Sequence, residues 1–277
     1  MTTTLRPTGP EERLEGGARA RKYDVCVNSR PVGRLRLTTD PRSAVPTGRL
    51  GDLWIAEADR RRGRATVAAL AAEEVLRGWG CRRIELFVPA DATPALRLGA
   101  ALGYTPRAHR MRKELTAPPE LPPGSTDRPL DEAAYPGWQK AAQEEFVRVM
   151  TAQGEPADRL TELVAASHRL LLPDGVHTPG QSLRVLSHEG TDVGTVWTAL
   201  DVPDEPGAGY VYDVKVAPEH RGRGHGRTLM GIAERECLAA GRDWLGLNVY
   251  ADNTVARRLY ESLDYRITEH WLWKPLL

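Results

Sequence analysis

An internal repeat constrains this chain more than any other feature of its sequence. When the 277-residue sequence is shifted along itself by 161 residues, two long segments coincide. RRRGRA at 60–65 falls on RGRGHG at 221–226, and residues 88–104 fall on residues 249–265. The register holds without a gap from about Tyr23 to Leu115. Because chance similarity does not keep one register over so many positions, the sequence indicates a duplicated domain.

The repeat also predicts the domain boundaries. We expect a first domain over residues 1–116, a linker rich in Pro and Gly over 117–125, and a second domain over 126–277. The second copy alone has a long leader before its matching part. Apolar residues at helical spacing predict two helices there, over 132–150 and 157–172.

Within each copy the pattern of apolar residues gives the same order of elements. A hairpin is followed by a strand, a helix that starts at a Gly-rich turn, another strand, a short helix and a last strand. In the second copy these fall at 182–200, 209–218, 225–241, 244–251, 254–263 and 265–276. The order predicts an α/β fold with a mixed sheet in both domains.

The Gly-rich turn at 221–229, RGRGHGRTL, has the composition of an anion site. Gly222, Gly224 and Gly226 let the backbone turn sharply and approach a ligand. The first amides of the following helix lack internal partners, so they suit a pyrophosphate. Arg221, Arg223 and Arg227 add charged donors. No GK[ST] follows and the spacing is GxGxG, so neither a Walker loop nor a dinucleotide fingerprint is indicated. An ordinary turn with solvated arginines remains the alternative.

A second group of residues begins the short helix. The register with Thr93-Pro94 makes Thr254 the N-cap, which leaves Asn253 outside the helix and free of a capping role. Tyr260 lies one turn after Ala256 on the same helix face. The alternative interpretation is a turn residue followed by a half-buried core tyrosine.

These two motifs resemble those of the GCN5-related N-acetyltransferase (GNAT) superfamily. Its cofactor loop, [Q/R]-x-x-G-x-[G/A], is matched by Arg221, Gly224 and Gly226, and again by Arg60, Gly63 and Ala65. The pattern N-x-x-A-x-x-L-Y is matched by Asn253, Ala256, Leu259 and Tyr260. The layout is similar to that of tandem GNAT proteins of the mycothiol synthase type, with a first domain that lacks the helical leader.

The resemblance implies acetyl-CoA as the cofactor and assigns roles to residues. Backbone amides from Gly222 to Arg227 would hold the pyrophosphate, and Tyr260 would protonate the departing thiolate. The strand at 214–216 would pair with the pantetheine arm. The residues implied in cofactor binding are Val214, Val216, Arg221, Gly222, Arg223, Gly224, His225, Gly226, Arg227, Asn248, Asn253 and Ala256.

The attacking amine must be neutral, so a base is useful. Asp213 is our candidate because it lies on the strand that would adjoin the thioester. A structural acid bonded to local backbone or paired with an arginine is the alternative, since Asp52 holds the same place in the first copy, which lacks the tyrosine. Glu144 and Glu145 on the leader are weaker candidates.

The first copy departs from the motifs. Ala92 stands opposite Asn253, Gly99 opposite Tyr260 and Phe87 opposite Asn248. Because glycine cannot donate a proton, we expect the first copy to be degenerate and inactive alone. Its RRRGRA loop leaves coenzyme binding open.

The expected function is an acetyl-CoA-dependent N-acetyltransferase that acts on a primary amine of a small molecule or peptide. The alternatives are a coenzyme-A sensor or scaffold without turnover, and an acyltransferase for longer acyl-CoA. Trp138, Trp197 and Tyr250 either line the acceptor pocket or belong to the core.

Composition excludes several other classes of protein. A net charge of +1 gives no reason to expect a nucleic-acid partner. No apolar run approaches the ~20 residues of a membrane span. Cys26, Cys81 and Cys237 form no CxxC pair, so we expect no metal, buried thiols and a cytoplasmic location. We expect a monomer or a weak homodimer.

Overall fold

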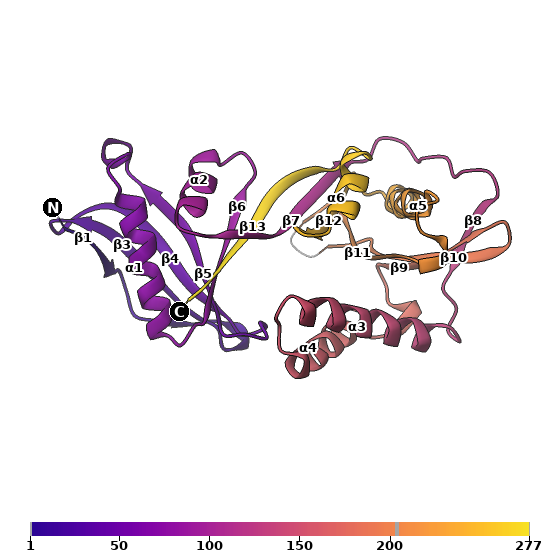
Figure 1. The fold of residues 1–277 in the computed structure, drawn as a ribbon, viewed down its shortest axis with the longest axis horizontal. Helices are drawn as coiled ribbons and strands as arrows, with labels where there is room; N and C mark the ends of the chain where they lie inside the picture. Colours follow the sequence, from indigo (N-terminus) through magenta and orange to yellow (C-terminus); the bar gives the residue numbers. More distant parts are fainter. Residues whose placement is uncertain (1, 203–204, 277) are drawn as a thin grey trace. The chain divides into compact units, whose positions relative to one another are not determined.

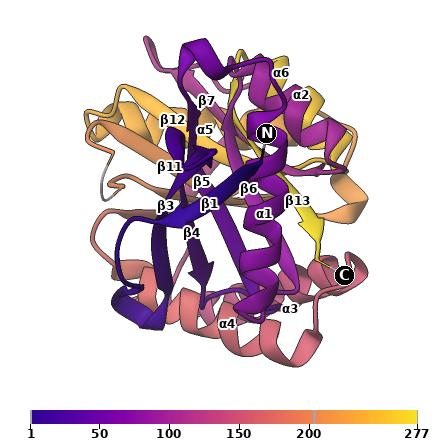
Figure 2. The same cartoon turned by 90° about the vertical axis from the view of Figure 1, so that its left-hand side faces the viewer.

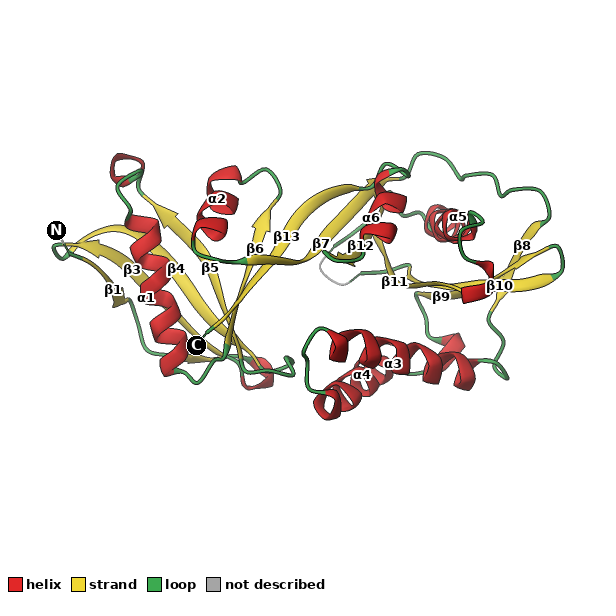
Figure 3. Cartoon of the chain, in the orientation of Figure 1, coloured by secondary structure: helices red, strands yellow, loops and turns green. Residues whose placement is uncertain are grey.

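The chain folds into two compact units. The structure is a computed structural model that describes residues 2–202 and 205–276. Unit 1 comprises Met1–Ala108 with Glu269–Leu277, and unit 2 comprises His109–Thr268. Each unit is a sheet with helices, as the repeat predicts (Figure 3).

Unit 1 is built on a sheet with the strand order β1-β3-β4-β5-β6-β13. Its strands are β1 (Thr3–Pro7), β2 (Glu12–Arg13, paired with β3), β3 (Arg19–Val27), β4 (Arg30–Asp40), β5 (Thr47–Ile55), β6 (Arg83–Pro89) and β13 (Arg266–Pro275). Its helices are α1 (Arg64–Gly78) and α2 (Thr93–Ala101), with 3₁₀ turns at Glu15–Gly17 and Glu57–Asp59. Helix α1 packs across β1 and β5 (Figure 2). Its stripe of Ala68, Ala72 and Leu76 is fully buried, which accounts for the choice of small residues there.

Unit 2 has the strand order β7-β12-β11-β10-β9-β8. Its strands are β7 (Thr105–Glu114), β8 (Ser125–Pro129), β9 (Gln181–His188), β10 (Thr191–Ala199), β11 (Ala208–Val216) and β12 (Trp244–Tyr250). Its helices are α3 (Tyr135–Ala152), α4 (Ala157–Leu171), α5 (His225–Ala239) and α6 (Thr254–Glu261), with 3₁₀ turns at Gly175–His177 and Pro218–His220. The leader of the second repeat therefore forms α3 and α4, as predicted.

Two cores lie on opposite faces of the sheet of unit 2. Helices α5 and α6 cover one face, and α3 and α4 cover the other (Figure 1). The first core joins the buried side of α5, including Leu229 and Ile232, to Val196 and Leu245 of the strands. The second core joins the leader to β8–β10 around Trp197. The leader thus covers one face of the sheet.

The two repeats exchange their last strands. Strand β13 ends the second repeat, yet its residues from Glu269 to Pro275 pair antiparallel with β6 of unit 1 (Figure 1). Strand β7 ends the first repeat, yet it stands beside β12 in unit 2. The compact units therefore differ from the contiguous segments 1–116, 117–125 and 126–277 that the repeat predicts. The two last strands fall in one register of the repeat, with Met111 opposite Leu272 and Lys113 opposite Lys274, so the register alone does not say which sheet each joins.

Within the described residues, no helix has both the length and the apolar character needed to cross a lipid bilayer.

Candidate active site

A gap opens in the sheet of unit 2 where two parallel strands separate. Strands β11 and β12 pair only from Ala208↔Trp244 to Val211↔Leu247. Beyond Val211, β11 continues to Val216 and, among the described strands, pairs there with β10 alone. The backbone amides and carbonyls on that edge of β11 are therefore available to a ligand. Unit 1 has the same feature, since β5 pairs with β6 only from Thr47↔Arg83 to Arg49↔Glu85.

A β-bulge marks the start of the gap. Trp197 on β10 faces Asp213, but the next residue, Thr198, faces Val211. Tyr212 is therefore the extra residue on β11. A bulge of this kind re-aims side chains, and it places Tyr212 and Asp213 together opposite Trp197. Sequence periodicity did not predict the bulge, although one inserted residue changes which face the following side chains occupy.

Asp213 carries an oxygen atom that lacks any partner. Its Oδ2 is buried and makes no hydrogen bond within the described part of the chain. Burial raises the pKa of Asp213 to about 6; Lys215 opposes this effect and Glu145 adds to it. A buried carboxylate oxygen without a donor is costly to the fold, which is the usual mark of a functional group. The alternative of a carboxylate satisfied by local backbone therefore lacks support for this oxygen.

Tyr260 lies close enough to Asp213 for their charges to interact. Burial, with a smaller contribution from the Asp213 charge, raises the pKa of Tyr260 to about 12. Its ring packs in the core between the sheet and α5, with its centroid 6.0 Å from that of Tyr265.

The Gly-rich turn has the left-handed backbone that its glycines allow. Gly222 has φ 77° and Gly224, the N-cap of α5, has φ 88°. No described atom lies within 4 Å of a Cβ built on either residue, so the space in front of them is open. Gly226 differs, because its Cβ would meet Leu259 Cδ2 at 3.1 Å. That glycine permits the close packing of α5 on α6.

Two of the three arginines of the turn are engaged in local structure. Arg221 donates from Nε to the carbonyl oxygen of Val216 at 3.2 Å, which ties the turn to the end of β11. Arg227 donates from Nη2 to Ser262 Oγ at 2.6 Å, which ties α5 to the end of α6. Arg223 is exposed.

His225 is buried at the first turn of α5, unlike the exposed residues around it. Its ring centroid lies 5.0 Å from that of His188 and 6.3 Å from that of His220. Burial and these two rings lower the pKa of His225. The side chain is therefore neutral at pH 7 and adds no positive charge to an anion site.

The structure corrects the expected role of Asn253. It is the N-cap of α6, and its Oδ1 accepts a hydrogen bond of 3.1 Å from the amide of Ala256. We expected Thr254 to cap the helix and Asn253 to be free of capping, which was wrong. An asparagine at this place suits the amide three residues on. In unit 1 the N-cap is Ala92, which has no such side chain.

The other residues expected to bind the cofactor or to act as a base lie partly in the core and partly at the surface of unit 2. Val214 and Val216 pack against the core of α5, as does Ala256. Asn248 is exposed on β12. Glu144 is exposed on α3, while Glu145 is half-buried and bonded to Arg148 at 2.5 Å.

Of the three aromatic residues expected near the acceptor, Trp197 belongs to the core. It is 4% exposed, and its Nε1 donates to Gln181 Oε1 at 2.8 Å. Trp138 packs edge-on against it, with ring centroids 5.8 Å apart. Tyr250 is half-buried on β12. Tyr212, which the sequence did not single out, is an exposed ring in contact with Trp197.

Unit 1 lacks the groups that gather at the gap of unit 2. A Cβ on Gly99 would meet Leu272 Cδ1 of β13 at 3.0 Å, so the exchanged strand leaves no room for a tyrosine there. Asp52, the counterpart of Asp213, is exposed and has φ 54°. The turn nevertheless keeps its left-handed backbone, with Arg61 at φ 57° and Gly63 at φ 71°.

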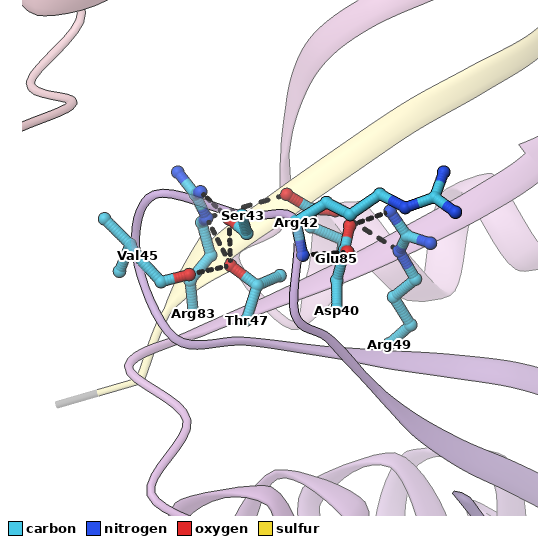
Figure 4. Close-up of polar contacts among 8 residues, drawn as sticks. All are labelled: Asp40, Arg42, Ser43, Val45, Thr47, Arg49, Arg83 and Glu85. Carbon is cyan, nitrogen blue, oxygen red and sulfur yellow. Dashed lines mark hydrogen bonds and ion pairs between the residues drawn. The ribbon is translucent and has the colours of Figure 1, made fainter. Parts of the chain in front are cut away.

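A network of charged side chains takes the place of a site on the sheet of unit 1 (Figure 4). Arg83 donates to Thr47 Oγ1 at 3.2 Å and to Ser43 Oγ at 2.9 Å. Glu85, whose pKa burial raises, lies 3.6 Å from both Arg83 Nε and Arg49 Nε. Arg49 occupies the position of Tyr210 in the other repeat. This face is filled by ion pairs and offers no counterpart of the Asp213–Tyr260 pair.

A mixed sheet whose parallel strands part beside a Gly-rich helix start defines a coenzyme-A-dependent acyltransferase fold. The acetyltransferase (GNAT) family model matches residues 5–104 and 140–265. A mycothiol acetyltransferase of Tsukamurella paurometabola is 30% identical over 81% of this chain and 77% of its own length. One from Thermobispora bispora is 35% identical over 67% of this chain and 63% of its own.

Solved structures show the same fold. A GCN5-related N-acetyltransferase from Sphaerobacter thermophilus superposes with a TM-score of 0.61 at 20% identity, over 92% of this chain and 80% of that one. A tandem GNAT protein from the clavulanic acid biosynthesis pathway gives 0.51 at 19% identity, over 95% and 85%. The chain belongs to the GNAT family as a tandem member, and it is an N-acetyltransferase. Proteins of this family use acetyl-CoA.

Proposed function

We propose that unit 2 transfers the acetyl group of acetyl-CoA to a primary amine of a small molecule or peptide by direct attack. Asp213 accepts the proton of the amine and Tyr260 donates to the departing thiolate. The observation that carries this proposal is the buried, unpartnered Oδ2 of Asp213 at the gap, within electrostatic reach of Tyr260.

The residues of the turn fit acetyl-CoA. The left-handed backbone at Gly222 and Gly224 faces open space at the start of a helix, where amides and the helix dipole favour a pyrophosphate. Residues 222–227 would hold this group, with Arg223 as an additional cation. The free edge of β11 from Asp213 to Val216 would pair with the pantetheine arm. When bound, acetyl-CoA supplies the thioester whose carbonyl carbon the amine attacks.

Asp213 suits the task of the base. An α-amine has a pKa of about 8 and a lysine amine of about 10.4, so either is mostly protonated at pH 7. With a pKa of about 6, Asp213 is ionised at pH 7 and is a stronger base than an ordinary aspartate. Lys215 nearby favours the ionised form.

Tyr260 suits the task of the donor. Its pKa of about 12 keeps the hydroxyl protonated at neutral pH. Because a thiol has a pKa of about 8.5, full transfer from the tyrosine is uphill in isolation. The hydroxyl therefore acts by a hydrogen bond to the developing thiolate, so that coenzyme A leaves as the thiolate while Asp213 holds the proton lost by the amine.

The two alternative functions predict different results when acetyl-CoA binding and thiol release are measured. A coenzyme-A sensor would bind acetyl-CoA and release no thiol. An acyltransferase for longer chains would prefer a longer thioester. The relatives named mycothiol acetyltransferase add one defined acceptor to the list of amines that should be tried.

The test is the release of free coenzyme-A thiol from acetyl-CoA by the full chain, with and without a panel of primary amines. The panel includes the acceptor of mycothiol acetyltransferases, and the acyl series runs from acetyl to octanoyl-CoA. Amine-dependent thiol release that is greatest with acetyl-CoA supports the proposal. Binding without release would favour the sensor, and faster release from longer thioesters would favour the other acyltransferase.

A further inference from the structure

We propose that Tyr212 is a stacking platform for a flat ring in the acceptor, so that unit 2 selects amines that carry a ring over acyclic amines. This inference rests on the proposed function, because it assigns the acceptor side of the same gap.

Tyr212 is an exposed aromatic ring held in a fixed place. It is 40% exposed, although its neighbours on β11 are buried or half-buried. Its ring lies 4.6 Å from that of Trp197, at an interplanar angle of 32°. Tyr210 lies edge-on at 5.1 Å and 63°. The ring is thus supported by one aromatic face and one aromatic edge.

The support beneath Tyr212 is itself rigid. Trp197 is bonded to Gln181 and packed between Trp138 and His168. His168 is buried and its pKa is lowered by burial, so it stays uncharged beneath the rings. An exposed ring on such a base loses little conformational freedom when a ligand stacks on it, which favours binding.

The bulge brings the platform to the reacting groups. Tyr212 is the inserted residue and directly precedes Asp213, with both opposite Trp197. A ring stacked on Tyr212 would place a short amine-bearing chain beside Asp213. The carboxylates of Asp213 and Glu145 favour a cationic amine at this point, while Lys215 is the opposing charge.

The other repeat shows that the fold does not require these aromatic residues. Unit 1 has a bulge in the equivalent strand pair, displaced to lie between Arg34 and Arg36, and Arg36, Arg49 and Gly51 stand where unit 2 has Trp197, Tyr210 and Tyr212. Arg49 there takes part in the ion-pair network of Figure 4. The sheet thus forms with charged residues at these places, and the aromatic set is particular to the unit that retains Asp213 and Tyr260 together.

Aromatic rings and the apolar faces of sugar rings share this stacking chemistry. Two matched pairs of acceptors show whether Tyr212 favours an aromatic ring or a sugar ring, and they separate stacking from simple hydrophobicity. Phenethylamine is compared with hexylamine, and glucosamine with its open-chain alditol, 2-amino-2-deoxyglucitol. Steady-state KM and kcat are measured for the wild type, Tyr212→Phe, Tyr212→Ala and Trp54→Ala. Trp54 is an exposed aromatic residue of unit 1 and serves as the control.

We expect a lower KM for the ring member of at least one pair. Tyr212→Ala should raise that KM about tenfold, with little change for the acyclic partner, for acetyl-CoA or in kcat. Tyr212→Phe and Trp54→Ala should keep the preference. Equal KM values within both pairs would overturn the stacking proposal, as would a Tyr212→Ala effect of the same size on ring and acyclic amines. In either case, amine-dependent turnover would still support the proposed function. Absence of thiol release with every amine would contradict both the proposed function and the stacking role of Tyr212.

Discussion

Lys274 forms a buried ion pair with Glu73 although the two residues come from different repeats. Lys274 Nζ lies 2.9 and 3.0 Å from the two carboxylate oxygens of Glu73, whose side chain is 2% exposed. The hydroxyl of Tyr104 donates to the same carboxylate at 3.0 Å. Unit 1 therefore receives from β13 the cation that its buried acid needs.

Unit 2 contains the reciprocal arrangement. Lys113 of β7 lies 2.8 Å from both carboxylate oxygens of Glu234, and the hydroxyl of Tyr265 donates to that acid at 3.2 Å. Each exchanged strand thus brings one lysine to a buried glutamate of the other repeat. The exchange is fixed by paired charges as well as by strand pairing.

Removing one partner of this pair should destabilise the protein more than removing both. Lys274→Met leaves Glu73 buried with the Arg77 guanidinium at 3.9 Å, and should lower the free energy of unfolding by on the order of 3 kcal/mol. Lys274→Met with Glu73→Gln should recover a large part of this loss, because no buried charge remains. Urea unfolding of the single and double variants measures both. A double variant no more stable than Lys274→Met would contradict the interpretation.

Asp213→Asn should stabilise the fold at alkaline pH. The folded pKa of Asp213 is raised from 3.8 to about 6, so its contribution to stability is present below pH 3.8 and is lost as pH rises through 6. At one pKa unit per about 1.4 kcal/mol, the neutral variant should gain about 3 kcal/mol at pH 8 and about half of that at pH 5. Urea unfolding at the two pH values checks this. An equal gain at both would show that ionisation is not the cause.

The ionisation of Asp213 should also appear in the pH dependence of kcat/KM. With an acceptor whose amine has a pKa of about 8, kcat/KM should rise with pH through two inflections, one near 6 from Asp213 and one from the amine. Asp213→Asn should lose the lower inflection and about 10²-fold or more of the rate. A lower inflection that survives in the variant would assign it to another group.

Tyr260→Phe should separate catalysis from folding. Since the substitution removes only the hydroxyl and keeps the ring packed in the core, the variant should unfold near the wild-type urea concentration. Its kcat should fall by about 10²-fold, with the KM for acetyl-CoA changed little. A higher KM for acetyl-CoA with an unchanged kcat would assign Tyr260 to acetyl-CoA binding instead of proton donation.

The sequence predicted the repeat, the order of elements and the position of the turn, because these depend on local patterns. It did not predict the strand exchange, since β7 and β13 hold equivalent places in the repeat and pairing is decided by contacts distant in the chain. The cap formed by Asn253 was missed because a register one residue off also satisfies the local rules. Tyr212 was missed because only the bulge turns it to the face of Asp213.

The most direct test of the central claim uses the repeat as its own control. Asp213→Asn and Asp52→Asn change equivalent residues in the two units, one buried and one exposed. We expect Asp213→Asn to lower amine-dependent thiol release from acetyl-CoA by about 10²-fold at pH 7.5, and Asp52→Asn to leave it within about twofold of the wild type. Equal losses in the two variants, or a loss confined to Asp52→Asn, would contradict the assignment of the active site to unit 2.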